Sequence, residues 1–563
     1  MRLRFSLKID RVKGRAYARL VRSVRHGRHV RPVTLYQIGR VTEDQIARIR
    51  TWLNTDPTLP ADPTTLFSDL NHVHIRRSWQ YGREALAHFV WRKLGLHTVV
   101  IEALGDVPRK GKIARWVETM VINRLAEPTS KYGLLDWLSL SATPYLLEFG
   151  NTPLHENLFY RAMDRLLRRQ DTLERLIYER VVRPLTSETA ILYHDLTSTY
   201  CEGEVTDFVR FGHNRDQVEG CPQVNWGMVV TPEGFPITLQ VYPGNTTDVT
   251  TVVGMRERLE QVFRLHQGIY VGDRGMISTD VEKDLTVHGF QWILAEKNDD
   301  IEGILETGSQ APVVAVSDRN EVREYMDPKG RRHVLLLNEE RRKEILEVLK
   351  IRQAQGKAII ERVRRGWAKR PDRAPHAVLR QAMRELSEKG LTDLFEVDVD
   401  DHTVQGVLTR TKDKVRRLEK WAGWWVLTTN TDLPVEEVAA RYLGLAVIER
   451  GWRELKGVLK VRPFRHRLEG RIRGHLLICE LAYLVDRYID WQVTRAKLQE
   501  GGIPVSGARA VEMLGSVTVN ETELATTGLR RLILTDLQPM QEEVLETVGV
   551  DSKVFQRGWG RLD

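Results

Sequence analysis

Three carboxylates are placed where they could act together on one substrate. Asp195 lies near the exit of a short apolar segment, and Asp273 lies at the C-terminal tip of another. Glu449 falls on a segment of helical periodicity that spans roughly residues 437–460. Carboxylate oxygens suit Mg²⁺, which is usually held by one or two carboxylates plus substrate phosphate. Two such ions about 3.5–4 Å apart can activate a nucleophile and stabilise the leaving oxygen of a phosphoryl displacement.

The elements that would position these acids alternate between strands and helices. Short apolar runs bounded by turn residues predict buried strands, and Asp248 and Ser278 are placed as N-caps of the helices between them. The stretch 297–420 interrupts this order with a long charged helix. The predicted core strands are 190–196, 224–230, 236–242, 268–273, 290–295 and 424–429.

The chain of 563 residues is too long for one hydrophobic core, so three or four domains are expected. The predicted fold class is multidomain α+β, with an α/β catalytic core, an inserted subdomain, and a small β module and a helical region before the core. The predicted parts begin with a basic β module at 1–60, with strands at 3–9, 15–22 and 30–37, and a helical region at 65–187. The core follows at 188–296 and 421–495, with the insertion at 297–420 and a C-terminal tail at 496–563.

Positive charge is concentrated in three parts of the chain. Residues 1–50 hold 14 Lys/Arg against three Asp/Glu, although the whole chain has a formal net charge of only +9. Residues 450–473 hold nine basic side chains against two acidic ones, and residues 361–384 hold eight against two. Basic stripes on an otherwise balanced chain indicate a polyanionic partner, because phosphate contacts release counterions.

Composition excludes several classes of protein. A hydrophobic fraction of 42% with 14 Trp excludes a disordered chain. No apolar run reaches the roughly 18 residues of a membrane span, and the charged start has no secretory pattern. The three Cys form no CxxC pair, which excludes a disulfide scaffold and Cys-based zinc sites. We therefore expect a cytoplasmic protein without a membrane partner.

The segments around the acids carry further motifs. The pattern Tyr-x2-Arg-x3-Glu-x6-Lys falls on Tyr442, Leu445, Glu449 and Lys456, with Leu445 in place of the arginine. The chain resembles DDE transposases of bacterial insertion sequences, in the group with this Tyr-Arg-Glu-Lys signature and an insertion before the catalytic Glu. The resemblance also rests on Tyr193-His-Asp-Leu-Thr, Gly212-His-Asn-Arg-Asp216, Gly244-Asn-Thr-Thr-Asp248, Val271-Gly-Asp-Arg-Gly275, Val461-Arg-Pro and Arg124-Leu-Ala-Glu-Pro-Thr-Ser-Lys131.

The resemblance implies an RNase H-like core in which Asp195, Asp273 and Glu449 are catalytic and bind Mg²⁺ or Mn²⁺ as two ions. It implies metal-dependent cleavage of insertion-sequence ends and strand transfer of the 3′-hydroxyl into target DNA. The partners would be double-stranded DNA and a second copy of the chain, forming a homodimer on paired ends at the bacterial nucleoid. No P-loop motif is present, so no nucleotide cofactor is expected. The predicted DNA-binding residues are Tyr442, Arg453, Lys456, Lys460 and Arg462.

The spacing of the signature residues matches a helix and places them along roughly one helix face. These residues are Tyr442, Leu445, Glu449, Lys456 and Lys460. Other residues have a structural reading. His194 and His213 are expected to be hydrogen-bonding residues, Asp248 a helix cap, and His475 a possible DNA contact without a catalytic role. Among the tryptophans, Trp424 or Trp425 is expected in the core and Trp367 is the exposed candidate for stacking on a base.

Three other functions stay open from the sequence. An RNase H-like nuclease without strand transfer would use the same acids. A catalytically inactive or repurposed sequence-specific DNA-binding protein would bind DNA without cleaving it, and the three intact acids disfavour it. A metal hydrolase acting on small substrates is disfavoured because the basic residues before position 51 would have no use.

Overall fold

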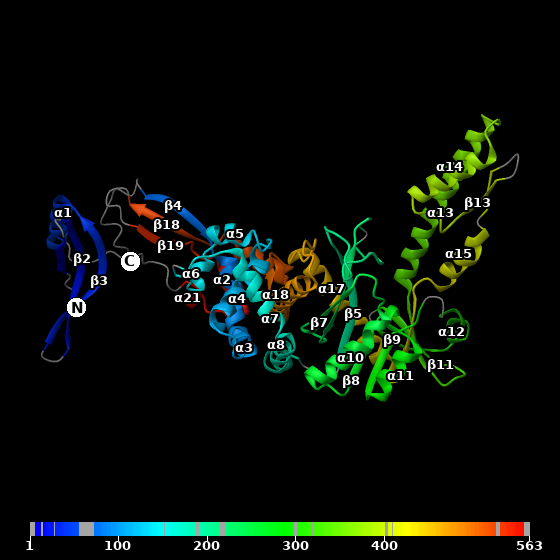
Figure 1. Ribbon diagram of the computed structural model, residues 1–563, viewed down its shortest axis with the longest axis horizontal. Helices are drawn as coiled ribbons and strands as arrows, with labels where there is room; N and C mark the ends of the chain where they lie inside the picture. Colours follow the sequence, from blue (N-terminus) through cyan, green and yellow to red (C-terminus); the bar gives the residue numbers. More distant parts are fainter. Residues whose placement is uncertain are drawn as a thin grey trace. The chain divides into compact units, whose positions relative to one another are not determined.

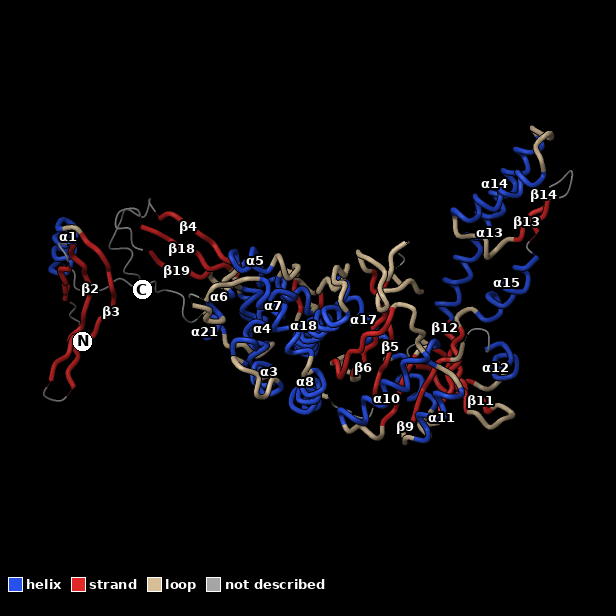
Figure 2. The backbone as a smooth tube through the Cα atoms, in the orientation of Figure 1, coloured by secondary structure: helices blue, strands red, loops and turns tan. Residues whose placement is uncertain are grey.

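A computed structural model places the chain in two compact units. Unit 1 comprises Met1–Arg168, Val458–Lys460 and Leu481–Asp563, and unit 2 comprises Arg169–Gly457 and Val461–Glu480. Figures 1 and 2 show the helices and strands of both. The structure describes residues 6–12, 15–26, 29–55, 73–150, 152–186, 191–213, 215–216, 218, 220–297, 301–317, 319–399, 404–407, 409–524 and 530–556.

A nine-stranded mixed sheet forms the centre of unit 2, with the strand order β10-β11-β12-β15-β9-β8-β5-β6-β7. Strand β5 is parallel to β8, and β8 is parallel to β9, whereas the other neighbours are antiparallel. The strands are β5 (Ile191–Tyr200), β6 (Gln223–Val230), β7 (Pro236–Pro243), β8 (Gly268–Gly272), β9 (Phe290–Ala295), β10 (Val313–Ser317), β11 (Asn320–Met326), β12 (Arg332–Asn338) and β15 (Trp424–Thr429).

The middle strands of this sheet are buried on both faces, which is why their sequences are nearly continuous apolar runs. Every residue of β6 is buried. Helix α11 packs on β9, and α16 packs on β10 and its neighbours β11 and β12. Helix α17 packs on β5, and α8 on β7. These helices are α8 (Gln170–Ile177), α10 (Val249–Phe263), α11 (Thr279–Val287), α16 (Val435–Leu443) and α17 (Ala446–Arg453), and a π-turn (Tyr178–Val182) and α9 (Arg183–Leu185) follow α8.

The predicted core strands are confirmed, with one correction to the strand that carries Asp195. Strand β5 continues to Tyr200, so Asp195 lies within the strand rather than near its exit. Its parallel pairing with β8 nevertheless stops at His194, which pairs with Gly272. Asp195 is therefore the first residue beyond the parallel pairing, and Asp273 is the first residue beyond β8. The two acids lie at the same edge of the parallel strands.

The single helix expected over 437–460 is wrong. Helix α16 ends at Leu443, α17 begins at Ala446, and a π-turn (Glu454–Val458) follows. The break coincides with Gly444, where a Cβ atom would lie 2.1 Å from the hydroxyl oxygen of Tyr193. The predicted residues therefore do not share one continuous helix face.

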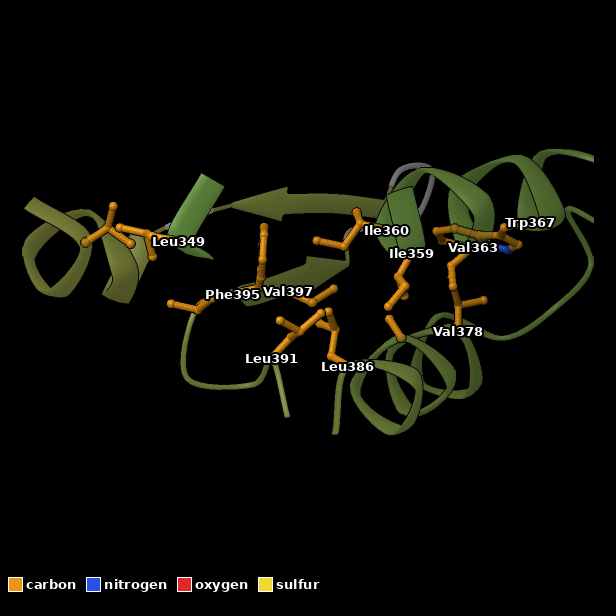
Figure 3. Close-up of a cluster of buried hydrophobic side chains, with 13 residues drawn as sticks. Leu349, Ile359, Ile360, Val363, Trp367, Val378, Leu386, Leu391, Phe395 and Val397 are labelled. Carbon is orange, nitrogen blue, oxygen red and sulfur yellow. The ribbon is translucent and has the colours of Figure 1, made fainter. Parts of the chain in front are cut away.

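Residues 301–421 contribute both to the sheet and to a separate hydrophobic core. Strands β10 to β12 extend the sheet, and α12 (Ile301–Gly308) packs against β11 and β15. The separate core is formed by residues of α13 (Glu339–Ala368), α14 (Pro375–Glu388), β13 (Glu396–Val399) and α15 (Thr409–Trp421), and β13 pairs with β14 (Val404–Val407). Figure 3 shows this core, with Trp367 among its buried side chains.

Two tryptophan expectations are decided by this packing. The expectation that Trp367 is exposed is wrong, because its ring is buried and its Nε1 donates to the carbonyl of Arg373 at 3.0 Å. The expectation that Trp424 is a core residue is confirmed, since it is buried in a cluster with Leu335 and Val426.

Unit 1 contains two three-stranded antiparallel sheets and a group of helices. The predicted N-terminal β module is confirmed as β1 (Ser6–Val12), β2 (Arg15–His26) and β3 (His29–Val41), followed by the unpredicted helix α1 (Glu43–Thr55). The second sheet pairs β4 (Val73–Gln80) with β18 (Thr518–Leu524) and β18 with β19 (Arg530–Leu534). The helices are α2 (Gly82–Lys93), α3 (Leu96–Ala103), α4 (Lys110–Ala126), α5 (Leu134–Leu140), α6 (Thr143–Leu146), α7 (Glu156–Leu167), α19 (Gly507–Met513), α20 (Pro539–Thr547) and α21 (Ser552–Phe555), with the hairpin β16 (Gln499–Glu500) and β17 (Ile503–Pro504).

Helix α18 (Glu469–Arg495) crosses the division of the chain between Glu480 and Leu481. Within the part of the chain that the structure describes, no helix is long and apolar enough to span a membrane.

Candidate active site

The carboxylate of Asp195 is held by two hydrogen bonds. The indole Nε1 of Trp452, on α17, donates to Asp195 Oδ2 at 2.8 Å, and the backbone amide of Leu196 donates to Oδ1 at 2.7 Å. Burial raises the pKa of Asp195 to about 7, and the hydrogen bond from Trp452 opposes this shift. The charge of Asp273 raises the same pKa further, whereas that of Arg215 lowers it. Asp195 and Asp273 therefore lie within electrostatic reach of each other.

Asp273 is exposed at the tip of β8 and contacts the tyrosine of the signature. The hydroxyl of Tyr442 donates to Asp273 Oδ1 at 3.2 Å. Burial, and after it the charge of Asp273, raises the pKa of the Tyr442 phenol. Tyr442 is therefore a neutral donor that orients Asp273. It was predicted to bind DNA, and its contact in this structure is with the acid.

Glu449 lies exposed in the first turn of α17. Its charge contributes to the raised pKa of Tyr442, so it lies within electrostatic reach of that phenol. Among the described residues, no group of three or more His, Cys, Asp or Glu side chains is arranged to hold a metal ion. Asp195 and Asp273 thus act electrostatically on each other, and Glu449 lies within electrostatic reach of the tyrosine that contacts Asp273. The three acids still offer only oxygen donors, the type that Mg²⁺ prefers.

His194 has the structural role expected from the sequence. It is fully buried beside Asp195, and its Nδ1 shares a hydrogen bond with the hydroxyl of Tyr270. Burial lowers the pKa of His194 to about 3, so the ring is neutral at ordinary pH.

Two of the predicted DNA-binding cations meet at one carboxylate. Asp216 Oδ1 accepts from Lys456 Nζ at 2.9 Å and from Arg462 Nη1 at 2.5 Å. The other two cations, Arg453 in unit 2 and Lys460 in unit 1, are exposed. Lys460 has a φ of 45°, and its backbone carbonyl accepts from Arg124, which lies in the same unit.

Two further expectations concern Asp248 and His475. The capping role of Asp248 is wrong, since its side chain makes no capping hydrogen bond within the described part of α10. Its carboxylate binds Arg215 Nη2 instead, at 2.6 and 2.5 Å. His475 is buried against Phe464 rather than placed for a DNA contact.

Sequence reasoning did not assign roles to Trp452, Asp216 and Arg215. The motif Gly212–Asp216 contains the last two, so its presence was a signal, although its spacing did not reveal their partners. Trp452 follows Glu449 by three residues, which places it on the same helix as the predicted acid, and its indole faces Asp195.

Comparison with known proteins places the chain in a family. The family described as "Transposase DDE domain" matches residues 187–485. No curated protein matches the chain. Among solved structures, the cryo-EM structure of a piggyBac transposase synaptic complex with hairpin DNA is similar, with a TM-score of 0.39 and 10% identity over 77% of this chain and 79% of that chain. Since the family match spans more than half of the 563 residues, this chain belongs to the transposase DDE domain family.

Proposed function

We propose that this protein is a DNA transposase of a bacterial insertion sequence. It cleaves the ends of the element and transfers the resulting 3′-hydroxyl into target DNA. The observation that carries the proposal is the family match over 187–485. The placement of Asp195 and Asp273 directly beyond the parallel pairing of β5 with β8 supports it. The catalytic core is RNase H-like, formed by 188–296 and 421–495, with the insertion 297–420 within it.

Asp195, Asp273 and Glu449 are the proposed catalytic acids and would hold Mg²⁺ or Mn²⁺. Two bound ions would activate the attacking oxygen and stabilise the leaving oxygen. The surrounding side chains have their own tasks. Trp452 keeps Asp195 in one orientation, and Tyr442 does the same for Asp273. Residues that lock the groups around a metal in this way commonly determine metal affinity and activity.

The proposed partners are the double-stranded DNA of the element ends and of the target. The basic module at 1–60 and the helical region at 65–187 would bind the ends, where phosphate contacts fix the position of the DNA without reading its sequence. A homodimer would pair two ends, and no nucleotide cofactor would be needed because transesterification conserves bond energy. The protein would act in the cytoplasm, on the nucleoid.

One second candidate has a specific observation in its favour. The described residues include no group of three or more His, Cys, Asp or Glu side chains arranged to hold a metal ion. A DNA-binding protein that has lost catalysis would tolerate such an arrangement, and so would a resting enzyme. An RNase H-like nuclease would differ from a transposase only in its products.

The test uses purified protein, Mg²⁺ and labelled DNA with the sequences that flank the gene, together with a supercoiled target. Products are resolved on a denaturing gel. A transposase gives joined end–target products that disappear with EDTA. Cleaved ends without joined products would indicate a nuclease, and specific binding without cleavage in Mg²⁺ or Mn²⁺ would indicate an inactive protein.

A further inference from the structure

Two of the motif segments are packed backbone against backbone. A Cβ atom at Gly212 would lie 2.0 Å from the carbonyl oxygen of Gly244, and one at Gly244 would lie 2.1 Å from that of Gln223. The side-chain amide of Gln223 donates to the Gly244 carbonyl at 2.9 Å and to that of His213 at 3.0 Å. No side chain fits between these segments, so the loop that carries Arg215 is fixed at its base.

A third segment, the loop after Asp273, packs against Asp248, the acid that binds Arg215. A Cβ atom at Gly275 would lie 2.5 Å from Asp248 Oδ2, the oxygen that also accepts from Arg215 Nη2. The backbone amide of Arg215 donates to the Ser198 hydroxyl at 3.0 Å. Arg215 is therefore held from both sides, by its backbone on β5 and by its guanidinium on Asp248.

Asp216, the next residue, has the environment of a buried counterion. Its side chain is only 2% exposed, and it accepts from Lys456, Arg462 and the backbone amide of Tyr200. A single buried carboxylate between two cations keeps both charged and close together, whereas the cations alone would repel each other. Asp216 thus determines where two of the predicted DNA-binding side chains lie.

The cluster formed by Arg215, Lys456, Arg462, Asp216 and Asp248 has a net positive charge and is partly exposed. Arg215, Lys456 and Arg462 carry three positive charges against the two negative charges of Asp216 and Asp248, which leaves one in excess. The side chains of Arg215 and Arg462 are 26% and 35% exposed, and Lys456 is 11% exposed. Arg215 Nη1 is itself buried and has no hydrogen-bond partner among the described residues. Guanidinium groups bind phosphate oxygens with several N–H donors at once.

The cluster lies beside the proposed catalytic acids. The backbone amide of Arg215 is bonded to Ser198, three residues beyond Asp195 on β5, and Asp248, which binds the Arg215 guanidinium, lies against Gly275, two residues beyond Asp273. Arg215 is therefore near the acids, and Asp216, its neighbour in the chain, binds Lys456. A phosphate held by these cations would be next to the acids.

We propose that Asp216 and Asp248 are positioning residues that hold Arg215, Lys456 and Arg462 as one preformed site for a single DNA backbone phosphate beside Asp195. This inference rests on the proposed function. It adds roles for Asp216, Asp248 and Arg215, and it assigns one DNA phosphate to the site. The acids act through the cations and do not touch the DNA.

In the experiment, the site and the total charge predict opposite changes in DNA affinity when an acid is removed. Removing a negative charge from a DNA-binding protein strengthens DNA binding if only the total charge matters. The site predicts the opposite for Asp216→Asn, because Lys456 and Arg462 lose their common anchor. The matched control is Asp280→Asn, an exposed acid on α11 that gives the same change in charge. Affinity for the labelled flanking duplex is measured by fluorescence anisotropy over a range of salt concentrations.

Asp216→Asn should weaken binding about tenfold and reduce the slope of log K against log salt by about 0.9, the contribution of one phosphate. Asp280→Asn should leave both unchanged or tighten binding slightly, and Asp216→Glu should restore part of the affinity. Arg215→Gln and Arg462→Gln should each reduce the slope, and the double variant should reduce it by about one in total rather than two, since the cations share one phosphate.

Several results overturn the inference. Wild-type slope and affinity in Asp216→Asn would show that the carboxylate positions nothing, and additive slope changes in the arginine pair would indicate two separate phosphates. Thermal unfolding identifies any variant that fails to fold, in which case the two arginine variants still decide. The proposed function fails separately, if the wild-type protein neither binds nor cleaves the DNA.

Discussion

The hydrogen bond from Trp452 to Asp195 allows the proposed site to be tested by a small change. Trp452→Phe removes the indole donor, which lies 2.8 Å from Asp195 Oδ2, and keeps an aromatic ring against Trp226, whose ring centroid is 4.8 Å away. A hydrogen bond to a charged group contributes about 1.5–3 kcal/mol. If this energy keeps Asp195 in its productive orientation, its loss slows cleavage by about 10- to 150-fold, since 1.36 kcal/mol corresponds to a factor of ten.

The assay is single-turnover cleavage of labelled end DNA over a range of Mg²⁺ concentrations. Trp452→Phe should cleave slowly and require more Mg²⁺, because a carboxylate that is free to rotate binds the metal less well. The matched control is Trp226→Phe, the other ring of the pair. Its Nε1 donates to the neutral Thr199 hydroxyl at 3.0 Å, so this variant should lose a little stability and retain cleavage.

The reasoning is refuted if Trp452→Phe cleaves at the wild-type rate with the wild-type dependence on Mg²⁺. Equal slowing in both variants would refute it too, because the effect would then come from the packing of the two rings and not from the hydrogen bond to Asp195.

Three further predictions concern stability. Burial raises the pKa of Glu84 from 4.5 to about 7, so the folded protein holds a proton on Glu84 that the unfolded chain has already lost. The contribution to the free energy of unfolding is fully present below about pH 4.5, and about 3 kcal/mol of it is lost as the pH rises through about 7. Urea unfolding should show that Glu84→Gln loses this dependence. Gly444→Ala should lower the melting temperature, because its Cβ would lie 2.1 Å from the Tyr193 hydroxyl, whereas Gly457→Ala, with nothing within 4 Å, should not. Trp367→Ala should lower stability by about 3–5 kcal/mol through loss of its buried ring, measured by calorimetry.

Much of the core was predictable because short-range patterns determine it. The strands 290–295 and 424–429 are apolar runs bounded by turns, and both occur with the predicted limits. Ser278 caps α11 as expected, with its hydroxyl accepting from the amide of Val281. Asp273 directly follows β8, as expected from the apolar run that ends there.

The remaining features depend on contacts between distant residues. Asp248 has the position of a cap, but Arg215, 33 residues away in the chain, binds its carboxylate. Gly444, at the break between α16 and α17, lies against the hydroxyl of Tyr193 on β5, far away in the chain. The pairing of β4 with β18 brings together two segments that are far apart in the chain, for which no local pattern exists.

The candidate site was predictable in its residue types and less so in its geometry. Asp195 and Asp273 were each expected at the end of a strand. Asp273 directly follows β8, whereas Asp195 lies within β5, at the point where its parallel pairing with β8 stops. Helical periodicity placed Glu449 and Lys456 on one continuous helix, whereas the chain forms two helices and a π-turn there. Periodicity describes a helix that continues, and it does not mark the residue at which the helix is interrupted.

The most direct test of the account compares wild-type protein with Asp195→Asn, using Asp280→Asn as the control for lost charge. Each protein is given the same labelled end DNA with Mg²⁺, and both binding and cleavage are measured. The account predicts that Asp195→Asn binds the DNA as well as the wild type and does not cleave it, while Asp280→Asn does both. Cleavage by Asp195→Asn at the wild-type rate would contradict the assignment of the active site.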